Sequence, residues 1–215
     1  MMIDSNSRFA RAIADEDVAA AIAIARDDPG VIDLKLPSSY QYERALHAAV
    51  RVDSAELAEI VLDHGVEVDV HDGEGYTPLF LAPERGASLD VVKLLVERGA
   101  DIHVDNDNPL WSAIWHVSYG FGGMPIVRYL VKQGSRPRGL THAAEAGKLR
   151  IVQVLTELGA NLNEVDEAGH TPLDYATGVA KTFMWEQIKK KKSREHKGVE
   201  KFLRSQGGKL SAELK

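Results

Sequence analysis

Histidines and carboxylates are the side chains of this sequence that could carry acid–base or metal chemistry. The eight histidines are scattered, and none belongs to an H-E-x-x-H motif or lies four residues from another histidine, the spacing that places two metal ligands on one helix face. Asp166, His170 and Asp174 are spaced by four residues, but a Thr-Pro step at 171–172 begins a new helix between them. These three residues therefore do not share a helix face, and we predict no metal ion and no cofactor.

A catalytic alternative concerns the middle of the chain. His116, His142 and Glu145 could act as acid and base if the fold brings them within hydrogen-bond reach of one another. The sequence has no cysteine and no G-x-G-x-x-G, Walker A or G-x-S-x-G motif, which excludes thiol chemistry, disulfides and the phosphate loops and nucleophile elbows that those motifs build. We therefore predict that the chain is not an enzyme, and keep this alternative open.

Aromatic side chains are concentrated in one stretch of eleven residues, although the whole chain has only 3 Trp, 6 Tyr and 5 Phe. With a neighbouring histidine, the cluster comprises Trp111, Trp115, His116, Tyr119 and Phe121. One interpretation is an anchor patch for a partner protein, because Trp and Tyr dominate the binding energy of protein interfaces. The other is that Trp111 and Phe121 fill space left by irregular helix stacking.

The elements that must position these side chains follow from an internal repeat. Residues 72–79 and 166–173 share the pattern D-x-x-G-x-T-P-L. Apolar patterns of helical period that end in glycine recur at 61–65, 91–100, 126–134 and 151–160. Thr followed by Pro is a good helix start, and glycine suits the left-handed residue after a helix, so each copy predicts two short helices and a loop.

These recurring motifs resemble the ankyrin repeat, which has a period of about 33 residues and the signature T-P-L-H-x-A. Six first-helix anchors can be aligned, with spacings of 37, 33, 31, 30 and 33 residues, at Phe9, Leu46, Leu79, Leu110, Leu140 and Leu173. The resemblance implies an all-α ankyrin-repeat solenoid of stacked helix-turn-helix units, with β-hairpin-like finger loops and degenerate capping repeats at both ends. We expect one domain over residues 1–215, with a tail at 209–215 and repeats near 5–40, 41–73, 74–105, 106–136, 137–167 and 168–208.

The finger loops are predicted to differ in length along the array. From the glycine that ends one repeat to the next anchor there are 14 residues at Gly65 and Gly159, but 11 at Gly99 and only 6 at Gly134. The third finger is therefore expected to be short and the fourth nearly absent. Because finger loops are common contact surfaces in the family, this predicts an open groove in the middle of the array.

The resemblance implies a protein–protein interaction module that binds a partner through its concave groove and finger loops, without catalysis. A narrower alternative is an inhibitor or immunity-type protein that occludes a partner enzyme or toxin. Acidic fingers would steer a partner with a basic surface, although they could equally be solubilising loops with Asx turns. The predicted contact residues are Asp72, Glu74, Leu81, Asp105, Asp107, Trp111, Trp115, His116, Tyr119, Phe121, His142 and Tyr175.

The charge balance argues against most other partners. Lys and Arg number 26 against 32 Asp and Glu, for a net charge of −6, which disfavours whole-chain binding to nucleic acid or to an anionic membrane. The basic run Lys189–Arg194 could be a nuclear address, a phosphate patch or the solvated face of a capping helix. No apolar stretch is long enough for a membrane helix, and acids precede the apolar part of the N-terminus, unlike a signal peptide. We expect a cytoplasmic monomer, or a nuclear one if the basic run is an address.

Overall fold

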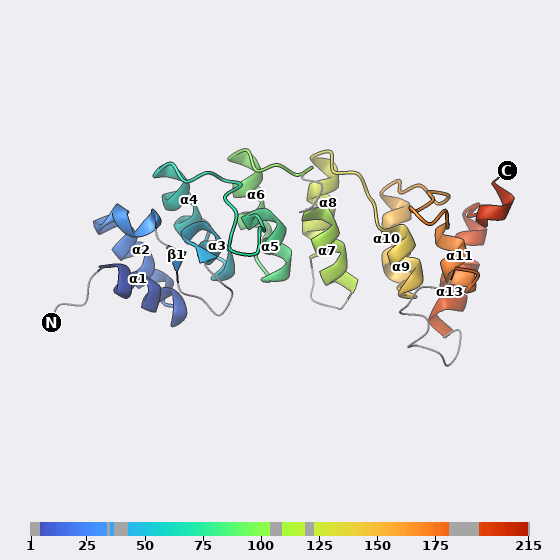
Figure 1. The fold of residues 1–215 in the computed structure, drawn as a ribbon, viewed down its shortest axis with the longest axis horizontal. Helices are drawn as coiled ribbons and strands as arrows, with labels where there is room; N and C mark the ends of the chain where they lie inside the picture. The colour runs from blue at the N-terminus through green and yellow to red at the C-terminus, as the bar shows by residue number, and fades with distance from the viewer. Residues whose placement is uncertain are drawn as a thin grey trace. The chain divides into compact units, whose positions relative to one another are not determined.

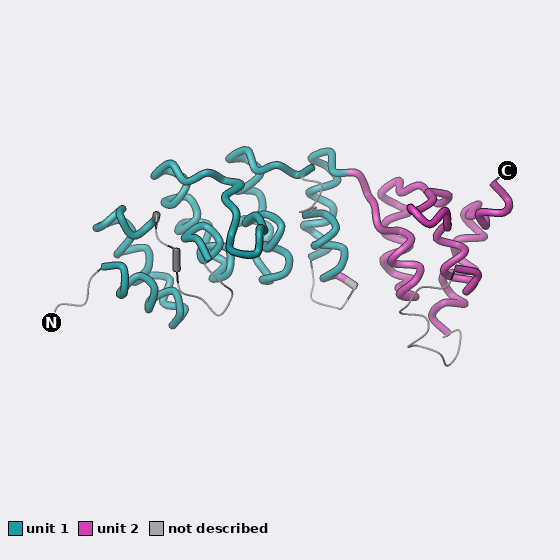
Figure 2. Tube along the Cα trace, viewed as in Figure 1, with its two compact units in different colours: residues 1–116, 121–135 teal, residues 117–120, 136–215 magenta. Residues whose placement is uncertain are grey.

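The computed structural model describes residues 5–33, 35–36, 43–103, 109–118, 123–180 and 194–214. The chain divides into two compact units, coloured separately in Figure 2. The first comprises residues 1–116 and 121–135, and the second comprises residues 117–120 and 136–215. Each unit is built from pairs of helices, as the ankyrin resemblance implies. The expected single domain over 1–215 stays a prediction.

Within the described residues, the helices of the first unit, labelled α1 to α8 in Figure 1, follow one another in pairs. They are α1 (Ser5–Ala14) with α2 (Val18–Asp27), α3 (Ala45–Arg51) with α4 (Ala55–Asp63), α5 (Pro78–Glu84) with α6 (Leu89–Glu97), and α7 (Pro109–Ser118, of which 109–116 lie in this unit) with α8 (Met124–Lys132). A 3₁₀ helix η1 (Pro29–Asp33) and two antiparallel strands, β1 (Lys35–Leu36) and β2 (Glu43–Arg44), connect the first pair to the second. Corresponding helices pack on each other, α3 on α5 and α4 on α6, so each pair covers the apolar side of the next.

The second unit repeats this arrangement with α9 (Leu140–Glu145), α10 (Leu149–Glu157), α11 (Pro172–Thr177) and α13 (Arg194–Ser205), followed by the 3₁₀ helix η2 (Ser211–Glu213). Helix α9 packs on α11, and α13 packs on α10 and α11. The mostly basic run at 189–193 lies outside the described residues, and Arg194 is the first residue of α13.

The predicted anchors form the core of both units. All six anchor side chains are buried, as are the small residues one turn into the first helices, Ala49, Ala82, Ala113, Ala143 and Ala176. In α6, Val91, Val92 and Leu95 are buried as the apolar period predicts, whereas Leu94 is only half-buried. The small side chains allow neighbouring helices to approach closely, which is why the short helices can share one continuous core in each unit.

The predicted helix starts and ends are confirmed. The hydroxyl of Thr77 accepts the backbone N–H of Phe80 at 3.3 Å, and Pro78 occupies the first helical position. Gly99 has a φ of +95° after α6, where its N–H bonds to the carbonyl of Val96 and that of Ala100 bonds to Leu95. These two bonds satisfy the last helical carbonyls, and the positive φ explains why glycine is required there.

Candidate protein-binding surface

Helix α7 carries the tandem tryptophans that the sequence predicted as a patch. Leu110, Ala113 and Ile114 face the core, so Trp111 and Trp115, one turn apart, share another face of the helix. Their ring centroids are 5.8 Å apart with the planes tilted by 43°. Trp115 is 38% exposed, and it is one of the few large apolar side chains on the described surface. An exposed indole held by a neighbouring ring is a suitable anchor for a partner, because little side-chain freedom is lost on binding.

The remaining predicted members of this patch have different positions. His116 is half-buried, and its Nδ1 bonds to the carbonyl of Ser112 in its own helix at 2.9 Å. Leu81 on α5 is 5% exposed and therefore offers a partner little area. Tyr119 and Phe121 lie outside the described residues.

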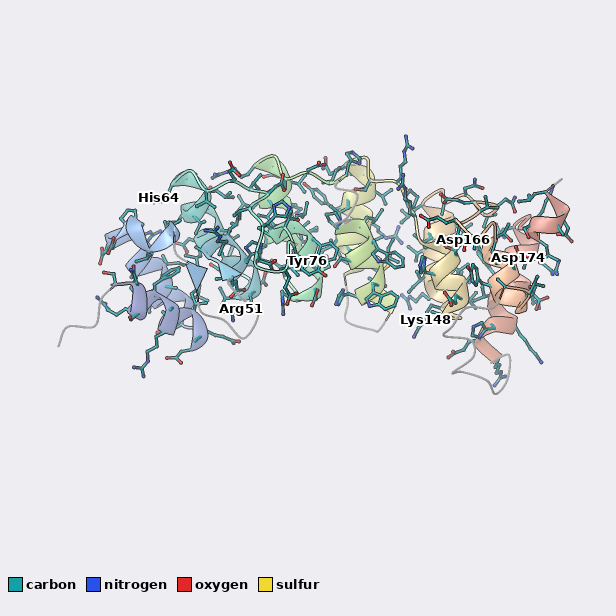
Figure 3. The ribbon with its side chains drawn as sticks, in the orientation of Figure 1. Arg51, His64, Tyr76, Lys148, Asp166 and Asp174 are labelled. Atoms are coloured by element: carbon teal, nitrogen blue, oxygen red, sulfur yellow. The ribbon has the colours of Figure 1, made fainter. Side chains whose placement is uncertain are left out.

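A second aromatic pair, which the sequence analysis did not single out, precedes and enters α5. The rings of Tyr76 and Phe80 stack with centroids 4.8 Å apart and planes 8° from parallel, and both side chains are half-buried. Figure 3 labels Tyr76 in the loop before the helix. The available sequence signal was the four-residue spacing of two aromatic residues across a Thr-Pro helix start.

The finger loops of the two full-signature repeats are tight turns held by an aspartate. The carboxylate of Asp72 accepts the backbone N–H groups of Glu74 and Tyr76, each at 2.9 Å. Asp166 does the same for Ala168 and His170, at 3.0 and 2.9 Å. These aspartates thus serve as Asx-turn residues as well as negative charges.

The exposed acid of the first of these turns is Glu74, which projects from the loop tip. Asp105 and Asp107, the predicted acids of the third finger, lie outside the described residues.

A largely buried ion pair joins β2 to the last residue of α3. The Nε of Arg51 donates to both carboxylate oxygens of Glu43 at 3.2 Å, and Glu43 is buried (Figure 3 labels Arg51). Burial raises the pKa of Glu43 above its ordinary value, despite the opposing attraction of Arg51. The ion pair fixes the short strand β2 to the end of α3, so we assign it a structural role.

His47 occupies the histidine position of the T-P-L-H signature and is buried in α3. Its Nε2 donates to the carbonyl of Tyr76 at 3.0 Å, which ties one repeat to the finger loop of the next. Within the described residues no hydrogen-bond partner reaches its buried Nδ1. Burial lowers the pKa of His47, although the bond to Tyr76 acts in the opposite direction. The ring is therefore a neutral structural donor at physiological pH.

In the second unit, the predicted contact residues His142 and Tyr175 differ in exposure. His142 is exposed on α9, whereas Tyr175 is buried in α11 and its hydroxyl donates to Asp166 at 2.5 Å. The ring of His170 meets that of Tyr175 edge-on, with centroids 5.7 Å apart. Burial and the bond to Asp166 raise the pKa of Tyr175. Tyr175 thus binds the finger loop that contains Asp166 to helix α11.

The possible acid–base residues Asp166 and Asp174 of the second unit make different hydrogen bonds. Asp166 and Asp174 have separate partners, since Asp174 binds Thr171 and the backbone of Ser211 (Figure 3). His116 belongs to the first unit, whereas His142 and Glu145 belong to the second. Among the described residues, no three His, Asp or Glu side chains are placed to hold a metal ion. In the same part of the chain, no helix is long and apolar enough to cross a membrane.

Comparisons with known proteins agree with the repeat structure. A family model described as ankyrin repeats in three copies matches residues 11–106 and 46–139, and a second, described as ankyrin repeats in many copies, matches residues 140–178. The ankyrin repeat domain of Bcl-3 superposes with a TM-score of 0.69 at 19% identity, covering 96% of this chain and 89% of that one. An ankyrin repeat domain from Acinetobacter baumannii AYE gives 0.65 at 23% identity, covering 94% and 98%. These likenesses establish the fold.

Among curated proteins, the chain is similar to NF-kappa-B inhibitor alpha of Gallus gallus, with 27% identity over 201 residues, which cover 86% of this chain and 62% of that protein. It is also similar to the B-cell lymphoma 3 protein homolog of Mus musculus, with 34% identity over 107 residues, covering 49% and 23%. The chain thus spans less than two thirds of the length of these relatives.

Proposed function

This chain belongs to the ankyrin-repeat family, and we propose that it is a protein-binding module that holds a partner on the exposed side chains of its first helices and finger loops, without catalysis. The observation that carries this proposal is the tandem of Trp111 and Trp115 on α7, with Trp115 left exposed. At protein interfaces, tryptophan is among the side chains that most often supply the binding energy.

The test is affinity capture with the immobilised full chain, followed by identification of the retained proteins by mass spectrometry. A partner captured by the unchanged chain should be retained at least about tenfold less by Trp115→Ala, since truncation of a central aromatic anchor commonly costs about 2 kcal/mol or more. Leu214→Ala is the matched control, because Leu214 is also an exposed apolar side chain but lies in the second unit. Equal capture by Trp115→Ala and the unchanged chain would reject α7 as the anchor.

The partner is proposed to present a basic surface to the acidic finger loops. Support comes from Glu74 at an exposed loop tip and from the charges of Asp72 and Asp166 in the two turns. Association should then slow as salt rises from about 50 to 300 mM, because the screening length of exposed charges falls from about 14 Å to about 6 Å over this range. An association rate that does not depend on salt would contradict a basic partner surface.

A narrower candidate is an inhibitor that occludes the active or binding site of its partner. The similarity to a protein named NF-kappa-B inhibitor alpha, which extends over 86% of this chain, favours it over a scaffold. The activity of the captured partner should fall in proportion to the chain added, up to one equivalent. If the partner keeps its full activity when saturated with this chain, the chain binds the partner but does not inhibit it.

We further propose that the chain is a cytoplasmic monomer. Its net charge of −6 disfavours self-association through like-charged surfaces, and the nuclear alternative depends on Lys189–Arg194, of which 189–193 lie outside the described residues. Light scattering gives the mass in solution, for which one chain corresponds to 23.6 kDa. Cell fractionation, with Lys190 and Lys191 replaced by Ala, separates the two locations.

A further inference from the structure

Helix α13 is amphipathic, and its packing defines which side faces solvent. Val199 and Leu203 are fully buried against the second unit, and His196 is nearly so. The Nε2 of His196 bonds to the carbonyl of Glu145 at 2.7 Å, and a Cβ on Gly147 would come within 2.9 Å of the imidazole ring. These contacts fix the rotation of α13 about its own axis.

The opposite side of α13 is a stripe of four exposed cations. Arg194, Lys197, Lys201 and Arg204 follow one another at intervals of three, four and three residues, and all four are exposed. At about 100° per residue these side chains fall within an arc of about 80°, and the stripe is about 15 Å long. We call these four residues the basic stripe.

The acids of the helix lie beside the stripe and not within it. Glu200 forms an ion pair with Arg204 at 3.5 Å, and Glu195 lies about 100° around the helix from Arg194. A terminal helix of a repeat array needs a polar outer side, which mixed charges supply equally well. Like charges three and four residues apart instead repel each other and weaken the helix, so capping alone does not explain a stripe of one sign.

We propose that the basic stripe docks an acidic segment of a partner polypeptide. This proposal deepens the protein-binding function above and rests on it. An anionic segment opposite the stripe would replace the repulsion between neighbouring cations with attraction.

The dimensions and surroundings of the stripe favour a polypeptide over other anions. It is one helix face wide, and it is flanked by Glu195 and Glu200 on a chain of net charge −6. A DNA duplex or an anionic membrane presents a broad negative surface that would also meet those acids. A short acidic segment can follow the stripe alone.

The test is an NMR titration of the isotope-labelled full chain with a peptide of twelve glutamates at low salt. The largest shifts of backbone amide signals should map to α13. Lys197→Glu with Lys201→Glu should weaken binding about tenfold or more, because two attractions become two repulsions. The uncharged pair Lys197→Gln with Lys201→Gln, which keeps good helix formers, should weaken it about threefold. The matched control is Arg136→Glu with Arg138→Glu, exposed cations of the same unit, which should change the affinity less than about twofold.

Three results would overturn the proposal. The first is that the amide shifts map away from α13. The second is that the stripe variants and the control variant weaken peptide binding equally. The third is that a DNA duplex or phosphatidylserine vesicles bind at least as tightly as the peptide and are equally sensitive to the stripe variants. The titration uses the glutamate peptide and no captured partner. Its failure therefore removes only the stripe and leaves the capture test of the protein-binding function with Trp115→Ala unaffected.

Discussion

Asp174 connects the last signature repeat to the C-terminal tail, so its removal should destabilise the second unit strongly. The side chain is 1% exposed. Its Oδ2 accepts the backbone N–H of Thr171 at 2.8 Å, the hydroxyl of Thr171 at 3.0 Å and the backbone N–H of Ser211 at 3.1 Å. The first of these bonds, together with the bond from the Asp174 N–H to the Thr171 hydroxyl, forms the capping box of α11. The bond from Ser211 holds the tail.

The magnitude follows from the groups that Asp174→Ala leaves without an acceptor. Loss of a helix-capping interaction costs about 1 kcal/mol, and a buried donor left unpaired costs about 1–3 kcal/mol. The N–H of Thr171 belongs to a fully buried residue, whereas Ser211 is half-buried, so water can replace part of the second loss. We expect a loss of about 2–4 kcal/mol for Asp174→Ala, and about half of that for Asp174→Asn, which keeps one acceptor oxygen.

Urea unfolding followed by circular dichroism measures this loss, and hydrogen exchange at the amide of Ser211 reports release of the tail itself. Exchange is needed as well, because repeat proteins can unfold in parts. The control is Asp90→Ala on α6, whose side chain is 81% exposed and whose removal should change stability by about 0.5 kcal/mol or less. If Asp174→Ala and Asp90→Ala shift the unfolding midpoint equally, the structural role assigned to Asp174 is wrong.

Three further predictions concern the core and the turns. Burial lowers the pKa of His47 in the folded chain, so the unfolded chain binds a proton at this histidine more readily, and the free energy of unfolding should fall as the pH drops from about 7 to 5. His47→Gln should flatten that part of the stability profile. An unchanged dependence of the urea midpoint on pH in this variant would contradict the prediction. Leu95→Ala empties a fully buried position and should cost about 2–5 kcal/mol in equilibrium unfolding, a prediction that an unchanged midpoint would refute. Tyr175→Phe removes the bond to Asp166 and should cost about 1 kcal/mol, measured by the same method; a stability equal to that of the unchanged chain would show that the bond contributes nothing.

Features with local causes were predictable from sequence. Thr77 and Pro78 start α5, and Gly99 ends α6, because capping and left-handed backbone depend on one or two residues. The buried anchors were equally predictable, since the repeat places them in phase. The structure shows that Trp115 is exposed and Trp111 half-buried. Whether the aromatic cluster anchors a partner or fills space between helices stays a prediction.

Features that depend on distant residues were not predictable. The tail bond joins Asp174 to Ser211, 37 positions apart, and no local pattern encodes it. Tyr175 was predicted as a contact residue; its side chain is buried, and its hydroxyl donates to Asp166 in the preceding turn. The basic run predicted from sequence, Lys189–Arg194, shares only Arg194 with the basic stripe. The sequence did not show which side of α13 would be covered by α10 and α11.

Gly147 contributes to the packing of α13, although it has no side chain itself. Its φ of +68° and the imidazole of His196 together leave no room for a methyl group. An alanine there would strain the turn and displace the imidazole of His196, one of the contacts that fix the rotation of α13. The position of the basic stripe therefore depends on an uncharged residue that lies outside the helix.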